Sequence, residues 1–360
     1  TISALGMAGT QSSGLWAFLG DGASCKVLHP GHCAACGLDA AFLAAAGMTG
    51  PEHILDAEDG GLLKAMSDGY DLSKAGAGLG KVWEILNMDV AKLCFEGEQE
   101  ELNKTKNAQI AILVTSLAIL EVLKNNGVEA DICTGLSLGE YTALIYSGYL
   151  SFEDGIKLIQ KRGYYMGTCV PKEEFKMAAV IGAQSSIIEK VCEKLNKKGM
   201  FVVPANYNYS GQTVISGNKA AVEEATKLLN DEGIRKIIEL KTSGPFHTEK
   251  LLEAKQLFEK ELEKVSFMEG KVPVIKNIDG SIYTNNDNMK EILAKHIVSP
   301  VRFDKAIKLM EDNDIDTYIE IGPGRALSGF VKKENKEANV MNVCDIETLN
   351  KVLEYIKESK

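Results

Sequence analysis

The spacing of apolar residues between positions 108 and 139 predicts a helix, a short strand and a second helix. Ala108–Asn126 holds an apolar run long enough for a buried helix, and Gly127 ends it because glycine adopts the left-handed conformation of helix C-termini. The apolar Ile132–Thr134 is typical of a strand, and Gly135–Gly139 opens the next helix. A strand, a tight turn and a helix in this order indicate an α/β unit.

The stretch from 171 to 241 alternates strand-like and helix-like segments. Strands are predicted at Met177–Ile181, Phe201–Ala205, Thr213–Ser216 and Lys236–Leu240, and helices at Ser185–Leu195 and Lys219–Asn230. The order β-α-β-β-α-β is that of a ferredoxin-like fold. Residues 171–241 are therefore predicted to form a small subdomain inside a larger α/β unit, which consists of residues 85–170 and 242–360.

The first 80 residues differ in composition from the rest of the chain. They contain 15 of the 34 glycines and no arginine, whereas the remainder is rich in lysine. The alanine-rich Gly37–Gly47 is helix-like, and Gly50-Pro51 and Gly60-Gly61 are turn signals. This shift predicts a separate, mainly helical segment over residues 1–84.

The charge and the cysteine pattern narrow the possible partners and environment. Forty Lys and Arg against 50 Asp and Glu give a net charge of −10, so no basic field attracts nucleic acid or an anionic membrane. The 8 cysteines are scattered, which indicates reduced thiols in a cytoplasmic protein rather than a disulfide framework. The most apolar stretch, Ile110–Leu120, is too short to span a membrane, and we expect neither a membrane span nor a signal peptide.

A candidate nucleophile lies in the predicted turn at Gly135–Gly139. Its sequence, GLSLG, fits the pattern G-x-S-x-G, in which the glycines allow a strained turn that exposes the serine hydroxyl at the start of a helix. Ser137 would then be the nucleophile, and the Leu138 N–H would stabilise an oxyanion. In a chain with 34 glycines, the pattern also fits a purely structural turn.

A serine nucleophile needs a base, and the chain has 5 histidines. His247 follows a Gly-Pro turn in the sequence SGPFHT, at a place typical of an active-site loop. His296 is in a helix-like segment before Ser299-Pro300. The pattern favours His247 as the base, with a structural role as the alternative.

Arg162 is one of only four arginines in the chain and follows the apolar Ile156 and Ile159 near the end of a predicted helix. A guanidinium pairs with a carboxylate through two parallel hydrogen bonds, which lysine cannot form. Arg162 is therefore compatible with a substrate that carries a carboxylate. A surface salt bridge is the alternative interpretation.

Seven ordered motifs resemble those of the malonyl-CoA:acyl-carrier-protein transacylase family over about residues 85–360. They are Leu93–Asn103, Gly135–Tyr141, Lys161–Met166, Met177–Gly182, Asn206–Gly217, Gly244–His247 and Ile319–Gly329. The resemblance implies an α/β-hydrolase-like large subdomain with a ferredoxin-like small subdomain. It also implies transfer of a malonyl group from coenzyme A to the phosphopantetheine thiol of acyl carrier protein in fatty acid biosynthesis, without a metal or a cofactor.

The resemblance gives a role to each matching residue. Ser137 would be acylated, His247 would be the base, Arg162 would hold the malonyl carboxylate, and Met166 would line the same pocket. The family uses a Ser–His dyad, and the histidine is oriented by a backbone carbonyl at a position that matches His296.

The chain departs from the family pattern in two places. Leu136 precedes the nucleophile, where the family often has histidine. The family also begins with a β-strand and a G-Q-G-x-Q loop that supplies a second oxyanion N–H, and here Gly9–Gly14 is only a superficial echo of that loop. We therefore expect slow malonyl transfer, and one alternative function is an impaired fusion that acts only as a binding module.

The N-terminal segment, about residues 1–88, resembles a fragment of the 2-methylcitrate dehydratase and cis-aconitate decarboxylase superfamily. The matching motifs are Ala8–Gly14, Trp16–Gly22, Lys26–Gly31 and Gly47–Pro51. In that superfamily, the residues that match Lys26 and His29 contribute to an active-site cleft. The resemblance implies a chimeric chain joined near Glu84–Val90.

Two further hypotheses concern the remaining polar residues. The cluster of His29, His32, Cys33 and Cys36 has ligand types that zinc prefers, but the resemblance and packing account for it, so we expect no metal. A serine esterase of the α/β-hydrolase type is a second alternative function. Such an esterase would use Ser137 in the same Gly135–Gly139 turn, with His296 as the base and Asp279 as the acid that orients it.

Overall fold

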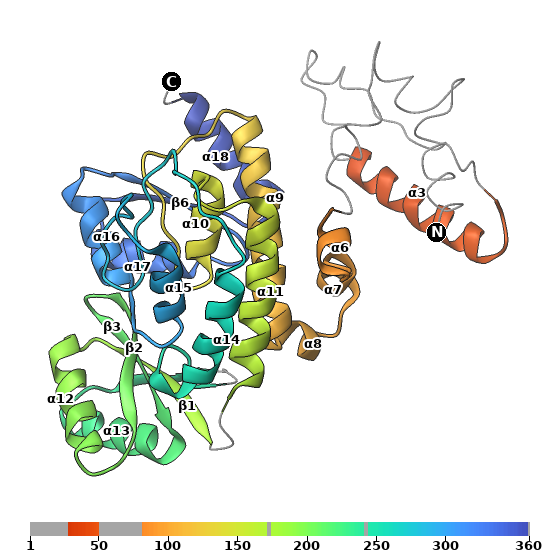
Figure 1. Ribbon diagram of the computed structural model, residues 1–360. Helices are drawn as coiled ribbons and strands as arrows, with labels where there is room; N and C mark the ends of the chain where they lie inside the picture. The colour runs from red at the N-terminus through yellow and green to blue at the C-terminus, as the bar shows by residue number, and fades with distance from the viewer. Residues whose placement is uncertain (1–27, 50–80, 171–173, 241–243, 359–360) are drawn as a thin grey trace. The chain divides into compact units, whose positions relative to one another are not determined.

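The structure, a computed structural model, describes residues 28–49, 81–170, 174–240 and 244–358 (Figure 1). The chain divides into two compact units, Thr1–Leu79 and Gly80–Lys360. In the first unit, helix α3 (Leu28–Ala45) contains most of the helix predicted at Gly37–Gly47. Gly47 follows this helix with a φ of 93°, a left-handed conformation that suits glycine at a helix end.

The large subdomain of the second unit is built mainly from helices. Before the small subdomain they are α6 (Lys81–Leu86), α7 (Val90–Glu96), α8 (Gln99–Asn103), α9 (Thr105–Asn125), α10 (Gly139–Ser147) and α11 (Phe152–Thr168). After it come η2 (Glu249–Leu251), α14 (Leu252–Leu262), α15 (Met289–His296), β5 (Val301–Arg302), α16 (Phe303–Asp312), β6 (Thr317–Ile321), α17 (Ala326–Glu334), β7 (Asn339–Val343) and α18 (Ile346–Glu358).

The small subdomain has the predicted ferredoxin-like topology. Its elements are β1 (Phe175–Ile181), α12 (Ser185–Asn196), β2 (Val202–Tyr209), β3 (Gln212–Asn218), α13 (Lys219–Asp231) and β4 (Lys236–Leu240). The strands are ordered β4-β1-β3-β2 with antiparallel neighbours, and α12 and α13 pack on the sheet around a buried apolar cluster (Figure 1). The prediction is confirmed because the alternating strands and amphipathic helices bury one common core.

One strand of this sheet comes from the large subdomain. β5 pairs in parallel with β2 through Asn206 with Val301 and Tyr207 with Arg302. Sequence periodicity did not predict this strand, because a pairing of this length carries no detectable alternation. β5 thereby joins the two subdomains by backbone hydrogen bonds.

The long helices α9 and α11 lie side by side in the large subdomain (Figure 1). At Gly163 of α11, an added Cβ would lie 3.1 Å from the Cα of Lys106, so glycine allows the close approach. By length and composition α9 could cross a membrane, with a mean hydropathy of 1.5. Its Ile110 and Leu113, however, are buried in the apolar core, and we interpret α9 as a core helix.

The strand predicted at Ile132–Thr134 is present only as a single bridge. Cys133 pairs in parallel with Val274, and within the described residues no longer ladder forms there. β6 and β7 make a parallel pair, and among the described strands β6 has β7 as its one neighbour. The large subdomain therefore places Gly135, which follows the bridge, at the end of a short parallel segment and just before α10.

Candidate active site

The GLSLG turn forms the strained elbow that its glycines predict. Ser137 has a φ of 54°, in the left-handed region that non-glycine residues rarely adopt. A Cβ on Gly135 would lie 2.6 Å from the Cα of Gly139, whereas a Cβ on Gly139 would meet nothing within 4 Å. The first glycine is therefore the one that the tight turn requires.

Asn277 holds this elbow from another part of the chain. Its Oδ1 accepts a hydrogen bond from the Ser137 N–H at 2.6 Å, and its Nδ2 donates to the Gly135 carbonyl at 2.7 Å. Its side chain is buried, so both bonds are shielded from water. Sequence reasoning missed this residue; the only local signal was a pair of polar residues, Lys276 and Asn277, directly after the apolar Val274 and Ile275.

Ser137 and His247 form a hydrogen-bonded pair, as predicted. Ser137 Oγ lies 2.8 Å from His247 Nε2, and His247 Nδ1 lies 3.0 Å from the carbonyl oxygen of His296. A carbonyl only accepts, so Nδ1 carries the proton and donates to it, which leaves Nε2 as the acceptor for the serine hydroxyl. His247 also has a positive φ, 60°, which sets its ring against the elbow.

The surroundings of His247 favour its neutral form. Burial lowers the pKa of the imidazole well below its usual 6.5, and the nearby His296 and Arg162 lower it further. The rings of His247 and His296 are stacked, with centroids 5.0 Å apart. A neutral imidazole with a free Nε2 lone pair is the form that accepts a proton from serine.

Arg162 is buried beside the serine rather than exposed in a surface salt bridge. Its side chain on α11 is 1% exposed, with Nη2 donating to Ser137 Oγ at 2.9 Å and Nη1 donating to Gln109 Oε1 at 2.7 Å. Among the described residues, no carboxylate lies within ion-pair distance of this guanidinium. Burial also lowers the pKa of Arg162. The salt-bridge alternative is therefore wrong, because the guanidinium faces inward.

Gln109 and Met166 complete the surroundings of Arg162. Met166 follows Arg162 by about one turn of α11 and is buried, and its Sδ lies 3.6 Å from Gln109 Nε2. Sequence reasoning missed Gln109, which lies on α9 just before the apolar run that begins at Ile110. The available signal was an amide at the start of an apolar run, and Asn107 of the same helix carries the same signal.

Leu138 stands at the N-terminus of α10. It is half-buried, and its backbone is helical, with φ −59° and ψ −39°. Among the described residues, no acceptor is bonded to the Leu138 N–H, so this donor remains open next to Ser137. The position matches the predicted oxyanion donor.

His296 contacts Glu140 and not Ser137. Its Nδ1 lies 3.0 Å from Glu140 Oε2, at ion-pair distance but without the alignment of a hydrogen bond. Asp279 accepts hydrogen bonds from the backbone and hydroxyl of Ser281 and reaches neither histidine. The esterase triad of Ser137, Asp279 and His296 is therefore wrong, because its members are not brought together.

The N-terminal predictions fall outside the described side chains. Lys26, together with Gly9–Gly14, lies outside the described residues, and the side chains of His29, His32 and Cys33 do as well. Within the described part of the chain, no group of three or more His, Cys, Asp and Glu side chains is arranged to hold a metal ion. The roles expected for Lys26 and His29 stay predictions.

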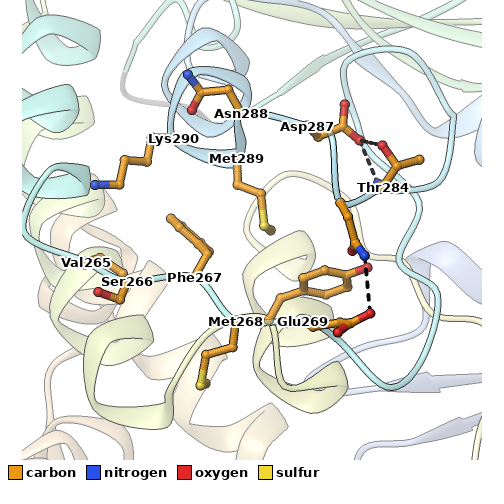
Figure 2. A pocket seen from close by; sticks show the side chains of 12 residues that line it. Val265, Ser266, Phe267, Met268, Glu269, Thr284, Asp287, Asn288, Met289 and Lys290 are labelled. Atoms are coloured by element: carbon orange, nitrogen blue, oxygen red, sulfur yellow. Dashed lines mark hydrogen bonds between the residues drawn. The ribbon is translucent and has the colours of Figure 1, made fainter.

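A pocket of about 550 Å³ opens beside the start of α15 (Figure 2). Tyr149, Phe267 and Met289 form its apolar lining. Its polar rim is internally hydrogen-bonded, as between Thr284 and Asp287. None of the residues predicted for the site lines this pocket. We therefore place the candidate active site at Ser137 and His247 and not in this pocket.

Known proteins with similar sequences and structures identify the family. The model described as "Acyl transferase domain" matches residues 56–353. A malonyl CoA-acyl carrier protein transacylase of Bacillus subtilis (strain 168) is 40% identical over 275 residues, which are 76% of this chain and 87% of that protein. The chain belongs to the malonyl CoA-acyl carrier protein transacylase family. The predicted resemblance over residues 85–360 is thus confirmed.

Solved structures of the family agree with this fold. The malonyl CoA-acyl carrier protein transacylase from Clostridium perfringens is 42% identical, with a TM-score of 0.74 over 77% of this chain and 87% of that one. A second structure, 31% identical with a TM-score of 0.74 over 79% of this chain and 94% of that one, is a malonyl-transacylase in complex with a type II PKS acyl-carrier protein.

The N-terminal segment matches another family. The model described as "MmgE/PrpD N-terminal domain" matches residues 1–75. This confirms the predicted segment of foreign type, and the matches of the two families overlap between residues 56 and 75.

Proposed function

We propose that this chain transfers a malonyl group from coenzyme A to the phosphopantetheine thiol of an acyl carrier protein, through a malonyl ester on Ser137. Family membership and the Ser137–His247 geometry support this proposal, as does the partner named for the related complex. The observation that carries it is Arg162, a buried guanidinium that donates to the nucleophile at 2.9 Å and has no carboxylate partner among the described residues. A substrate carboxylate supplies the missing counter-ion.

In the first half-reaction, His247 Nε2 takes the proton of the Ser137 hydroxyl while Oγ attacks the malonyl thioester carbonyl. The Leu138 N–H donates to the oxygen that becomes negative in the tetrahedral intermediate. The carbon–sulfur bond then breaks, coenzyme A leaves as a thiol with the proton from His247, and malonyl-Ser137 remains.

The second half-reaction runs the same steps with a different thiol. His247 takes the proton of the carrier-protein thiol, the sulfur attacks the ester carbonyl, and the bond to Ser137 Oγ breaks as Oγ regains a proton. Arg162 pairs with the malonyl carboxylate in both halves and fixes the acyl group next to Oγ. We propose that neither a metal nor a redox cofactor takes part.

A cytoplasmic location fits this reaction. Cys94, Cys133, Cys169, Cys192 and Cys344 of the described part of the chain are thiols and not disulfides. Reduced cysteines are the usual state in the cytoplasm. Cysteines in this state support the proposed location.

Intact-mass analysis after incubation with malonyl-CoA tests the proposal. We expect one malonyl adduct on the wild-type chain, located on Ser137 by peptide mapping, and none on Ser137→Ala. Ser210→Ala is the matched control, because Ser210 is an exposed serine in the turn between β2 and β3 and should leave the adduct unchanged. An adduct that persists in Ser137→Ala would contradict the mechanism, and no adduct on the wild type would favour the binding-module alternative.

A further inference from the structure

Glu140 is a fully buried carboxylate that the proposed mechanism does not use. It lies on α10 with 0% of its surface exposed. Its Oε1 accepts a hydrogen bond from the Tyr283 hydroxyl at 2.8 Å and one from the Asn277 N–H at 3.3 Å. Its Oε2 lies 3.0 Å from His296 Nδ1. One carboxylate therefore contacts two separate parts of the chain, the paired turn that holds Asn277 and Tyr283 and the end of α15 at His296.

Two of these partners each support one half of the Ser–His pair. Asn277 holds the elbow through the Ser137 N–H. His296 accepts the Nδ1–H of His247 with its backbone carbonyl, and so sets the tautomer and the direction of Nε2. Glu140 is thus linked to the nucleophile through one partner and to the base through the other.

We infer that Glu140 is a positioning residue that fixes the supports of Ser137 and His247 relative to each other. This inference rests on the proposed function. Both Ser137 and His247 have left-handed backbones, and such conformations persist only where the surroundings hold them. The fixed supports keep Oγ and Nε2 at the 2.8 Å that proton transfer requires.

The cost of burying a carboxylate argues against a role of Glu140 in packing alone. A buried carboxylate is costly to desolvate, and an apolar side chain of similar size would fill the same space without that cost. The carboxylate is kept because it accepts from the hydroxyl and the N–H and attracts the histidine at the same time. An apolar side chain provides none of these contacts.

Three variants separate positioning from packing. Glu140→Ala removes every contact of the carboxylate. Glu140→Gln keeps an oxygen acceptor for Tyr283 and Asn277 but removes the negative charge beside His296 Nδ1. Leu144→Ala is the control, since Leu144 lies on the same helix and is equally buried, but its apolar side chain cannot hydrogen-bond to either support.

We expect Glu140→Ala to lower kcat about 100-fold with little change in KM for malonyl-CoA, because a small misplacement of reacting groups costs that much while Arg162 keeps its hydrogen-bond partners Ser137 and Gln109. Glu140→Gln should recover most of the rate. Leu144→Ala should keep the kcat of the wild type per folded molecule, measured against the folded fraction from circular dichroism. Tyr283→Phe, which removes only one hydrogen bond to Glu140, should lower kcat to a smaller degree.

Labelling of Ser137 by phenylmethylsulfonyl fluoride tests Glu140 without malonyl-CoA. Oγ forms a bond to sulfur, fluoride leaves, and the serine proton goes to His247, so the labelling rate reports the alignment of the pair. We expect slower labelling in Glu140→Ala than in the wild type or Leu144→Ala. Equal labelling and equal kcat in Glu140→Ala and Leu144→Ala would overturn the inference, as would Glu140→Gln being as slow as Glu140→Ala. A wild type that is labelled but not malonylated would instead contradict the proposed function.

Discussion

His247 Nδ1 donates a hydrogen bond to the backbone carbonyl of His296 at 3.0 Å. A carbonyl oxygen here takes the place that a carboxylate occupies in a Ser-His-Asp triad. It fixes the tautomer of His247 without adding a negative charge next to the ring. The side chain of His296 is therefore free to bind elsewhere, and it lies against Glu140.

Substitutions at the two histidines should have unequal effects. His247→Ala removes the general base and should lower kcat for malonyl transfer by about 10²–10⁴-fold. His296→Gln keeps the backbone carbonyl, and its amide can donate to Glu140, so its loss should stay below about 10-fold. Steady-state kinetics of both variants, with circular dichroism as a check of folding, tests this. A larger loss in His296→Gln than in His247→Ala would contradict the assignment of the base.

Arg162→Ala should lower the preference for malonyl over acetyl groups more than it lowers the rate of acyl transfer itself. The variant loses a charge-assisted pair of about 1.5–3 kcal/mol that only a carboxylated acyl group makes, so malonyl transfer should weaken relative to acetyl transfer by roughly 10–150-fold. The measurement is the ratio of kcat/KM for malonyl-CoA and acetyl-CoA. Arg302→Ala is the matched control, since Arg302 already pairs with Asp304. An unchanged ratio in Arg162→Ala would make Arg162 a structural residue.

Gln109→Glu should compete with the substrate for Arg162. The new carboxylate would pair with the guanidinium that now donates to the Gln109 amide, so kcat/KM for malonyl-CoA should fall by about 10-fold or more while that for acetyl-CoA changes little. Gln160→Glu, on the same helix as Arg162 but bonded to the Leu86 carbonyl, is the control. Equal effects of both variants on the two substrates would argue against a role of Gln109 in orienting Arg162.

The pH dependence should reflect the depressed pKa of His247. Burial, with His296 and Arg162 nearby, holds this pKa well below 6.5, so kcat/KM should rise with pH, reach half its maximum below 6.5 and be flat near neutrality. In the unfolded chain His247 binds a proton near 6.5, so its contribution to stability is present above that pH and is lost as the pH falls through the interval down to the folded pKa. A kinetic midpoint at or above 6.5 would contradict the prediction.

The last prediction concerns the effect of residues 1–84 on the rate of malonyl transfer. Among the described strands β6 pairs with β7 alone. The family resemblance implies that other members begin with a further strand, followed by a loop that supplies a second oxyanion donor. Replacement of residues 1–84 by such a strand and a G-Q-G-x-Q loop should raise kcat by about 10²–10³-fold, the usual cost of one missing donor. A parent chain as fast as the replaced one would show that another backbone group already donates.

The sequence by itself determined the elements whose signals are local. The strands and helices of residues 174–240 follow from alternation and amphipathic spacing, because each element buries one face in a common core. Ser137 was identified for the same reason, since the glycine that its turn requires stands two positions before it. His247 also followed from its neighbourhood, a Gly-Pro turn after a strand.

Only the tertiary structure decided which side chains surround the serine. Asn277 is 140 positions from Ser137, and Gln109 is 53 positions from Arg162, so no local spacing connects them. The structure also decided that Arg162 is buried without a carboxylate partner in the described part of the chain and that His296 faces Glu140. Periodicity specifies which face of an element is buried, whereas the packing of distant elements decides which polar groups on those faces meet.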